Sequence, residues 1–212
     1  MDKMIDAYFY ILGLLATVTF SVSGVLAVRS QGVDLFGVLV IGVVTAVGGG
    51  TIRDVLLGVP VFWLLDSIYI WCAVAAAALA FALRDVFARA FRLLLYLDAL
   101  GVALFAALAV QKTLGLGLDG IHAVAMGVIT GIGGGIIRDV IAGRPTLIMM
   151  RDLYATPILF GIAVQLLLLE WLHVEPLVAV LSGVACIFAF RSLAIHFHWQ
   201  MPDFLSFQRD SP

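Results

Sequence analysis

A seven-residue phrase occurs twice in this chain, each time inside an apolar stretch. Residues 48–54 read Gly-Gly-Gly-Thr-Ile-Arg-Asp, and residues 133–139, 85 positions further on, read Gly-Gly-Gly-Ile-Ile-Arg-Asp. Glycine costs about 1 kcal/mol relative to alanine inside a helix, and a charge at the centre of a bilayer costs about 2.5–3.5 kcal/mol. Because the chain carries both costs twice, the pattern indicates a path for something polar through a membrane.

The rest of the chain is apolar enough to be a membrane domain. It is 63% hydrophobic and 12% charged, whereas soluble domains are about 25% charged. Segments of about 18–25 residues can cross a hydrocarbon core about 30 Å thick. We predict seven such transmembrane helices in one domain over residues 1–212, at about 8–28, 34–58, 67–84, 92–112, 119–143, 152–169 and 175–197.

The duplicated phrase belongs to a longer internal repeat. Residues 34–60 align without a gap on 119–145, and 13 of the 27 positions are identical. The same register matches Phe20 with Phe105 and Tyr69 with Tyr154. Each repeat then holds three helices, and an odd number of spans inverts the second repeat in the membrane.

The fold class follows from the number of predicted helices in each repeat. We predict an all-α integral membrane protein with repeat one over about 8–84 and repeat two over about 92–169. The seventh helix, about 175–197, has no counterpart and is a candidate for packing or for contacts between subunits.

The triple glycines predict a break or kink in the second and fifth helices. A break would leave free N–H groups at the start of each second half-helix, where Asp54 and Asp139 would suit the positive end of the dipole. The alternative is that the glycines simply let two helices approach closely.

The two Arg-Asp pairs carry the charge of the predicted site. Neighbouring residues on a helix do not face each other, so we expect cross pairs, Arg53 with Asp139 and Arg138 with Asp54. These pairs would clamp the repeats together, with or without lining a pore.

Other polar residues in the apolar segments are weaker candidates. Asp98 is either functional or paired with Lys112 or a neighbouring helix. Thr45 and Thr130 precede the glycines and are candidates to line a path, whereas the hydroxyls of the first segment are expected to bond to backbone carbonyls or another helix. The full predicted path consists of Thr45, Gly48, Gly49, Gly50, Thr51, Arg53, Asp54, Asp98, Thr130, Gly133, Gly134, Gly135, Arg138 and Asp139.

Several classes of function are not indicated. The sequence has no Ser-His-Asp grouping, no metal-ligand cluster and no phosphate loop, so we expect neither an enzyme nor a cofactor. The net charge of −2 gives no indication of a nucleic-acid partner. Cys72 and Cys186 lie in apolar segments and are expected to be buried thiols and not a disulfide.

The distribution of basic residues predicts the orientation. Seven spans place Lys3 and Lys112 on one side, and the positive-inside rule makes the more basic side cytoplasmic. We therefore expect the N-terminus outside and the C-terminus in the cytoplasm. The basic side holds Arg29, Arg84, Arg89, Arg92, Arg144, Arg151, Arg191 and Arg209.

Taken together, the doubled Gly-Gly-Gly-x-Ile-Arg-Asp, the three-plus-three-plus-one spans and Phe20-Ser21-Val22-Ser23-Gly24 resemble the prokaryotic branch of the trimeric intracellular cation (TRIC) channels, also named as a glycine-transporter family. The resemblance covers about residues 8–197. It implies a homotrimer in a bacterial inner membrane, in contact with lipid, with one pore for K⁺ and Na⁺ in each subunit between the second and fifth helices. The animal members carry a lysine beside the second-helix glycines, where this chain has Arg53-Asp54.

Electrostatics alone does not select the permeant species, because arginines and helix N-termini favour anions while carbonyl ends and aspartates favour cations. A passive K⁺-permeable channel is the function that the resemblance favours. A secondary transporter for a small zwitterion such as glycine is the alternative, and a purely structural membrane protein is a third.

Overall fold

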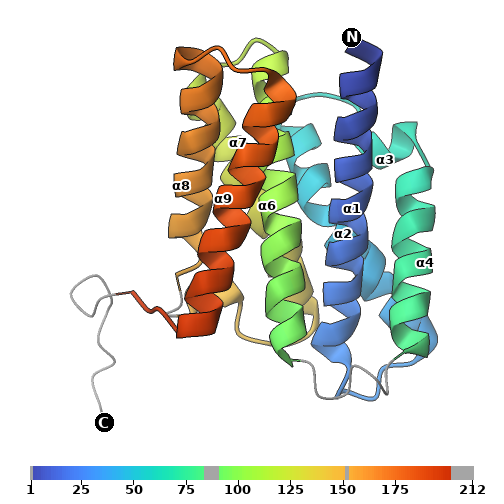
Figure 1. Cartoon of the computed structure of the whole chain (residues 1–212). Helices are drawn as coiled ribbons and strands as arrows, with labels where there is room; N and C mark the ends of the chain where they lie inside the picture. The colour runs from blue at the N-terminus through green and yellow to red at the C-terminus, as the bar shows by residue number, and fades with distance from the viewer. Residues whose placement is uncertain (1, 84–90, 151–152, 202–212) are drawn as a thin grey trace.

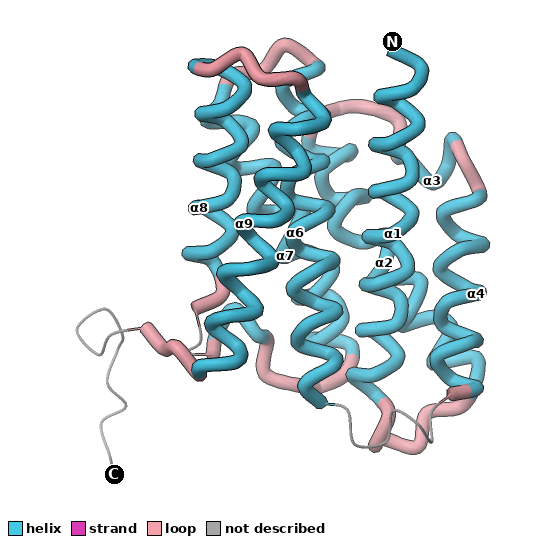
Figure 2. Tube along the Cα trace, in the orientation of Figure 1, coloured by secondary structure: helices cyan, strands magenta, loops and turns pink. Residues whose placement is uncertain are grey.

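The computed structural model describes residues 2–83, 91–150 and 153–201, which form a bundle of helices running side by side (Figures 1 and 2). In chain order the elements are α1 (Asp2–Val28), α2 (Leu35–Leu56), α3 (Phe62–Leu65), α4 (Ile68–Ala82), α6 (Phe91–Gly115), α7 (Gly120–Ile141), the 3₁₀ turn η1 (Leu147–Met149), α8 (Ala155–Leu166), the π-helical turn η2 (Leu167–Trp171) and α9 (Pro176–Phe197). Among the described residues, six longer helices and the four-residue α3 make up the two repeats, and α9 follows them.

Among the described residues, five helices are long and apolar enough to cross a membrane: α1, α2, α6, α7 and α9. The other two apolar helices, α4 and α8 with η2, are shorter. The 15 residues of α4 cover about 22 Å, which is less than a hydrocarbon core of about 30 Å. Seven spans of about 18–25 residues are thus confirmed for five helices and not for the third and sixth. The α4 helix begins within one residue of the predicted start, at Ile68, whose N–H is held by Asp66 Oδ1 at 2.9 Å, and ends at Ala82.

The N-terminal caps of α2 and α7 are equivalent in the two repeats. The side chain of Asp34 caps α2 by accepting the N–H of Gly37 at 2.8 Å, and Asp119 caps α7 by accepting the N–H of His122 at 3.1 Å. An aspartate at this position satisfies one of the N–H groups that a helix leaves free at its start. Two residues 85 positions apart therefore fix equivalent helix starts.

The central layer consists of α1, α2, α6 and α7, in which α1 packs on α6 and α2 packs on α7. The α4 helix covers α1 and α2 at one edge of the bundle, and α8 lies at the other edge (Figure 1). Residues 102–107 of α6 are all buried, and three of these six are alanine. Small side chains of this kind allow neighbouring membrane helices to approach closely.

The helices α2 and α7 run in opposite directions (Figure 1). Two hydrogen bonds show that the end of α1 and the end of α7 lie at the same end of the bundle. Gln31 Nε2 donates to the carbonyl of Ala142 at 2.7 Å, and Arg144 donates to the carbonyl of Ala27 at 3.1 Å. The inversion of the second repeat is therefore confirmed.

The α1 helix starts at one end of the bundle and α9 finishes at the other (Figure 1). The basic residues used to predict orientation divide into two groups. Arg29, Arg92 and Arg144 lie in the described part of the chain at or near helix ends, and Arg191 lies within α9. The others, Arg84, Arg89, Arg151 and Arg209, lie outside the described residues. Which side of the membrane each end faces stays a prediction.

The unmatched helix α9 packs against α6 and α8. Its contact with α8 uses glycine, because a Cβ built at Gly161 would lie only 2.9 Å from the carbonyl oxygen of Gly183. The predicted packing role of this helix is confirmed, and contacts between subunits stay a prediction. Cys72 on α4 and Cys186 on α9 are both free thiols and half-buried.

Candidate functional site

The triple glycines form the point where α2 and α7 cross. A methyl group on Gly49 would collide with the carbonyl oxygen of Thr130, and one on Gly134 would lie 2.5 Å from the carbonyl oxygen of Thr45. A Cβ on Gly133 would lie 3.1 Å from the Cα of Gly49. The two backbones therefore touch, which a side chain at these positions would prevent.

The expected break in these helices is wrong, and a kink at the glycines stays a prediction. Both α2 and α7 continue as α-helix through residues 48–50 and 133–135. Close approach, the alternative interpretation, explains the central glycines without a break. The outer glycines serve neighbouring side chains, since a Cβ at Gly50 would lie 2.5 Å from the ring of Phe62 and one at Gly48 would lie 2.6 Å from Ile137.

Two threonines lie one turn before the glycines, and both are fully buried. The hydroxyl of Thr45 donates to the carbonyl of Ile41 at 2.6 Å. The hydroxyl of Thr130 has no hydrogen-bond partner among the described residues. Thr51 differs from both, because it accepts the indole N–H of Trp63 at 2.9 Å and donates to the carbonyl of Val47 at 2.8 Å. The structure thus leaves one buried oxygen without a partner near the crossing.

A second repeat-related pair lies beside the crossing. Phe20 and Phe105 stack with their ring centroids 5.6 Å apart and their planes at 18°. Both rings are buried, and a Cβ at Gly134 would lie 3.5 Å from Phe20. The residues that the repeat aligns therefore meet where the two halves of the protein join.

A fully buried carboxylate, Asp98, organises the charges of repeat two. Arg138 donates to its Oδ1 at 2.8 Å, and Arg191 of α9 donates to its Oδ2 at 3.0 Å. The hydroxyl of Tyr154 donates to the same Oδ2 at 3.0 Å. Arg138 also pairs with Asp139 at 2.8 Å, so two arginines face two carboxylates. This balance is what a buried ionic cluster requires.

Repeat one has a smaller cluster of charges. Arg53 Nε contacts Asp54 Oδ1 at 2.7 Å, and Lys112 of α6 contacts the same oxygen at 2.7 Å. The other carboxylate oxygen accepts the N–H of Phe62 at 2.9 Å. In repeat two, Asp139 likewise accepts the N–H of Leu147 at 3.1 Å, so both aspartates hold the loop after their helix.

The predicted cross pairs are wrong. Arg53 pairs with Asp54 and Arg138 with Asp139, each with its neighbour in sequence. The helices cross at their glycines and diverge in opposite directions, so each arginine lies about 6 Å beyond the crossing on its own side. The Cα atoms of the two arginines are therefore about 12 Å apart along the bundle. A long arginine side chain curls back far enough to reach the adjacent carboxylate.

Asp98 does pair with neighbouring helices, as one of the two interpretations expected. The pairing of Asp98 with Lys112 is wrong, because Lys112 pairs with Asp54. Sequence reasoning also assigned Arg138 to Asp54 and missed the other two partners. Tyr154 was used only as a repeat match, and Arg191 only as a basic residue for orientation. Arg191 lies in an apolar helix, and that position alone is a signal of a buried partner. Its guanidinium also lies 3.8 Å from the centroid of the Tyr154 ring.

The hydroxyls of the first segment behave as predicted. Thr17, Thr19 and Ser23 donate to carbonyls one turn earlier in α1, at 2.9 Å each. Ser21 donates instead to the carbonyl of Ala73 on α4 at 2.7 Å. Ser23 also accepts from Arg138 at 3.2 Å, which links α1 to the cluster of repeat two.

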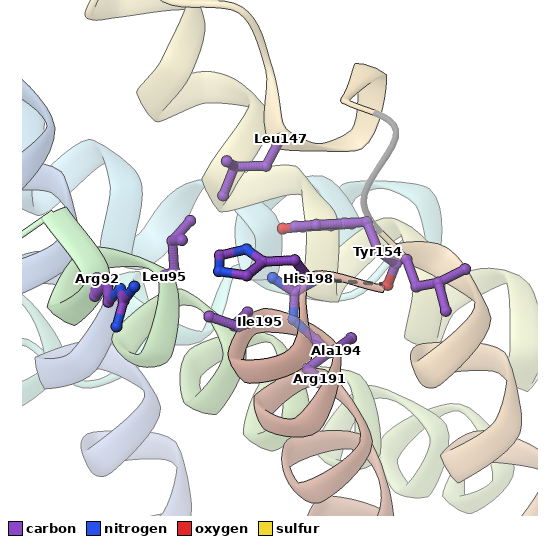
Figure 3. Close-up of a pocket in the computed structure, with 9 residues that line it drawn as sticks. Arg92, Leu95, Leu147, Tyr154, Arg191, Ala194, Ile195 and His198 are labelled. Carbon is purple, nitrogen blue, oxygen red and sulfur yellow. Dashed lines mark hydrogen bonds between the residues drawn. The ribbon is translucent and has the colours of Figure 1, made fainter. Parts of the chain in front are cut away.

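A cavity adjoins each cluster. The cavity of repeat two has a volume of about 220 Å³. Figure 3 shows Tyr154, Arg191 and His198 facing into it, with Arg92 at its side. The dashed line in that view is the hydrogen bond from Arg191 to the carbonyl of Tyr154, at 3.4 Å. The cavity of repeat one has a volume of about 330 Å³ and is lined by Phe9, Tyr10, Gly13, Arg53, Phe62, Tyr69, Phe105, Leu108, Gln111 and Lys112.

Known proteins resemble the chain in sequence and in fold. The family model described as Glycine transporter matches residues 10–85 and again 95–170, which is the repeat. A UPF0126 membrane protein of Vibrio cholerae is 40% identical over 92% of this chain and 82% of its own length. The UPF0126 inner membrane protein YadS of Escherichia coli is 40% identical over 92% of this chain and 95% of its own length.

Solved structures agree with this assignment. The TRIC trimeric intracellular cation channel orthologue from Rhodobacter sphaeroides superposes with a TM-score of 0.86 at 33% identity, over 91% of this chain and 99% of that chain. The resemblance drawn from the doubled phrase is therefore confirmed. With its duplicated match, its membrane-spanning helices and its fold, this integral membrane protein belongs to the family described as Glycine transporter, and it shares the fold of the prokaryotic TRIC channels.

Proposed function

We propose that the protein is a channel for monovalent cations, K⁺ and Na⁺, with one pore in each subunit of a homotrimer. The similarity to the Rhodobacter sphaeroides TRIC channel orthologue supports both the activity and the assembly. The relative YadS supports a place in the bacterial inner membrane. The distribution of basic residues supports an N-terminus outside and a C-terminus in the cytoplasm. The activity is passive, so no catalytic residue or cofactor is assigned.

The observation that carries the proposal is the chemistry of the α2–α7 crossing. The atoms that approach the opposite helix there are the carbonyl oxygens of Thr45 and Thr130, and the hydroxyl of Thr130 is without a partner among the described residues. Oxygen dipoles of this kind are what replaces the hydration shell of K⁺ in selective pores. A Cβ built on Gly135 would lie 3.6 Å from a guanidinium nitrogen of Arg138 and 3.1 Å from Asp98 Oδ1, so the arginine charge beside the crossing is balanced by a carboxylate.

The pore would run between the two cavities. Phe105 lines the cavity of repeat one, and Phe20 stacks on that ring beside the glycine crossing. Separation of α2 from α7, with a bend at the glycines, would open this short barrier and expose the threonine oxygens. The proposed path keeps the residues selected from the sequence, from Thr45 to Asp54 and from Thr130 to Asp139, with Asp98 as a buried anchor of the arginines.

A secondary transporter for a small zwitterion such as glycine is the second candidate. The description of the family supports it, and so does a cavity that presents both cationic side chains and amide and hydroxyl groups. A transporter needs a saturable site that closes on both sides, whereas a channel needs a continuous path.

The two candidates are separated by reconstituting the protein in a planar bilayer under a K⁺ gradient and measuring glycine uptake in matched liposomes. A channel gives discrete currents that reverse near the K⁺ equilibrium potential. These currents are expected to vanish in Gly49→Ala and to persist in Gly115→Ala, where an added Cβ meets nothing within 4 Å. Silent bilayers with saturable glycine uptake would overturn the channel in favour of the transporter.

A further inference from the structure

The two repeats differ at one position that matters for charge. The two repeats align with an offset of 85 residues, which pairs Arg53 with Arg138 and Tyr69 with Tyr154. In this alignment, Gly13 of α1 is the counterpart of Asp98 of α6. In repeat two, the carboxylate of Asp98 receives Arg138, Arg191 and the hydroxyl of Tyr154. In repeat one the arginine and the tyrosine remain, but the carboxylate between them is missing.

A cavity lies beside the position of the missing carboxylate. Gly13, Arg53 and Tyr69 all line the repeat-one cavity of about 330 Å³. A Cβ built on Gly13 would lie 3.0 Å from the hydroxyl of Tyr69, so this hydroxyl lies close to the α1 backbone, whereas Tyr154 donates to a carboxylate oxygen of Asp98 at 3.0 Å. The cavity is therefore lined by an arginine and a tyrosine whose counterparts bind a carboxylate in the other repeat.

The cluster beside this cavity has an excess of positive charge. Arg53 and Lys112 both contact Asp54, so two cations share one carboxylate. The side chain of Arg53 is 6% exposed and that of Lys112 is 33% exposed. Asp66 accepts the hydroxyl of Tyr10 at 2.8 Å, but its own side chain does not line the cavity. Two cations close to one carboxylate leave one positive charge in excess, and an anion in the cavity would balance it.

The lining also provides neutral hydrogen-bonding groups. Tyr10, Tyr69 and Gln111 face the same space as the two cations. The amide oxygen of Gln111 is buried and has no hydrogen-bond partner in the described part of the chain. This oxygen can accept a hydrogen bond from an ammonium group. If the amide group is rotated by 180°, its NH₂ can donate to a carboxylate instead.

We propose that this cavity is a binding site for a small carboxylate, which supplies the negative charge that Asp98 supplies in repeat two. The carboxylate accepts from Arg53, Lys112 and the hydroxyl of Tyr69. A volume of about 330 Å³ is at the small end of ligand pockets, which suits a ligand of the size of acetate or a simple amino acid. The site goes beyond cation permeation and does not depend on it, because binding needs no flux.

Calorimetric titration of the purified full-length protein in detergent tests the proposal. Sodium acetate, glycine and sodium chloride are titrated separately at constant ionic strength. Acetate is expected to bind saturably, once per subunit, and at least tenfold more tightly than chloride, because two oxygens can meet separate donors. Glycine that binds more tightly than acetate would identify an amino acid as the ligand through its ammonium group. Acetate that binds more tightly than glycine would identify a simple carboxylate.

Three variants locate the site. Gly13→Asp supplies the missing carboxylate from the protein and is expected to abolish acetate binding. Lys112→Gln removes one charged donor and is expected to weaken binding about tenfold or more. Arg29→Gln removes the same charge from an exposed position outside this cavity and is expected to leave binding unchanged.

Several results would overturn the site. These are no heat of binding for acetate or glycine, equal affinity for chloride and acetate, or acetate binding that survives in folded Gly13→Asp. An equal loss of affinity in Arg29→Gln and Lys112→Gln would show that binding depends on the overall charge of the protein and not on a site at Lys112. If Gly13→Asp fails to fold, the comparison of Lys112→Gln with Arg29→Gln decides alone. None of these results bears on the K⁺ currents, so the failure of this site and the failure of the channel are distinguishable.

Discussion

At the scale of single residues, the carboxylate of Asp98 determines how the second repeat is held together. It is fully buried and receives two guanidinium groups and one hydroxyl, from α7, α9 and the residue that precedes α8. A buried ion pair adds little net stability compared with apolar packing, but removal of one partner strands a charge. The cluster therefore acts more as a constraint on which helices meet than as a source of stability.

The substitution Asp98→Asn tests this interpretation. It keeps the shape of the side chain but leaves Arg138 and Arg191 with one carboxylate between them. We expect a loss of about 3–5 kcal/mol of unfolding free energy, measured by denaturation in detergent. Asp6→Asn removes a carboxylate from an exposed position on α1 and should change the stability little. Equal stability of the two variants would show that Asp98 does not balance the arginines.

The glycines of the crossing permit a second test at the residue scale. Gly134→Ala would place a methyl group 2.5 Å from the carbonyl oxygen of Thr45, and backbone atoms cannot move aside locally. We expect a cost of about 1–3 kcal/mol, as for other overpacked positions. Gly115→Ala is the matched control because its added methyl meets open space, and it should be neutral or slightly stabilising. A neutral Gly134→Ala would contradict the tight crossing.

At the scale of helices, the repeat reuses the same local devices at equivalent positions. Asp34 and Asp119 start α2 and α7, and Asp54 and Asp139 each hold the backbone N–H eight residues further on. These contacts are local in sequence. They explain why the two repeats have the same order of helices and equivalent helix starts.

The cap at Asp119 makes a prediction about pH. The backbone N–H of His122 is the main cause that holds the pKa of the Asp119 carboxyl below its usual value, followed by the His122 side chain. A carboxyl with a lowered folded pKa stabilises the fold above its unfolded pKa, and this contribution is lost as the pH falls through the folded value. Asp119→Ala should therefore lower the melting temperature at pH 7 and by less at pH 3.

Asp119→Asn provides the matched control, because asparagine caps helices about as well and does not titrate. Its melting temperature should stay close to that of the unmodified protein at pH 7. A loss in Asp119→Ala that is as large at pH 3 as at pH 7 would show that the ionised carboxylate is not what stabilises the start of α7.

Much of this element-scale organisation could be predicted from the sequence, and the limits have a physical reason. Apolar length and the 85-residue register predicted the order of the helices, the inversion and the meeting of Phe20 with Phe105. They could not predict contacts that depend on how far each helix extends past the crossing. The predicted break was wrong because the glycines allow two unbroken helices to approach closely. The cross pairs were wrong because the two arginines lie on opposite sides of the crossing. The same residues remain at the centre of the proposed path.

At the scale of the whole molecule, the two halves are related but not equivalent. The seventh helix supplies Arg191 to the cluster of repeat two, and this cluster has as many carboxylates as cations. The cluster of repeat one has Lys112 in place of that arginine and lacks the second carboxylate. The charges of the repeat-two cluster are thus balanced within the cluster, whereas the repeat-one cluster has one cation in excess beside its cavity.

The central claim is that permeant cations pass the α2–α7 crossing, and a cysteine at Thr130 tests it most directly. In a protein with Cys72→Ala and Cys186→Ala, Thr130→Cys is exposed to a small cationic methanethiosulfonate reagent during K⁺ current recording. Val178→Cys, on the exposed face of α9, is the control. We predict that modification at Thr130 blocks the unitary currents and that modification at Val178 leaves them intact. Currents that persist unchanged after modification of Thr130→Cys, verified by mass measurement, would contradict a pore at this crossing.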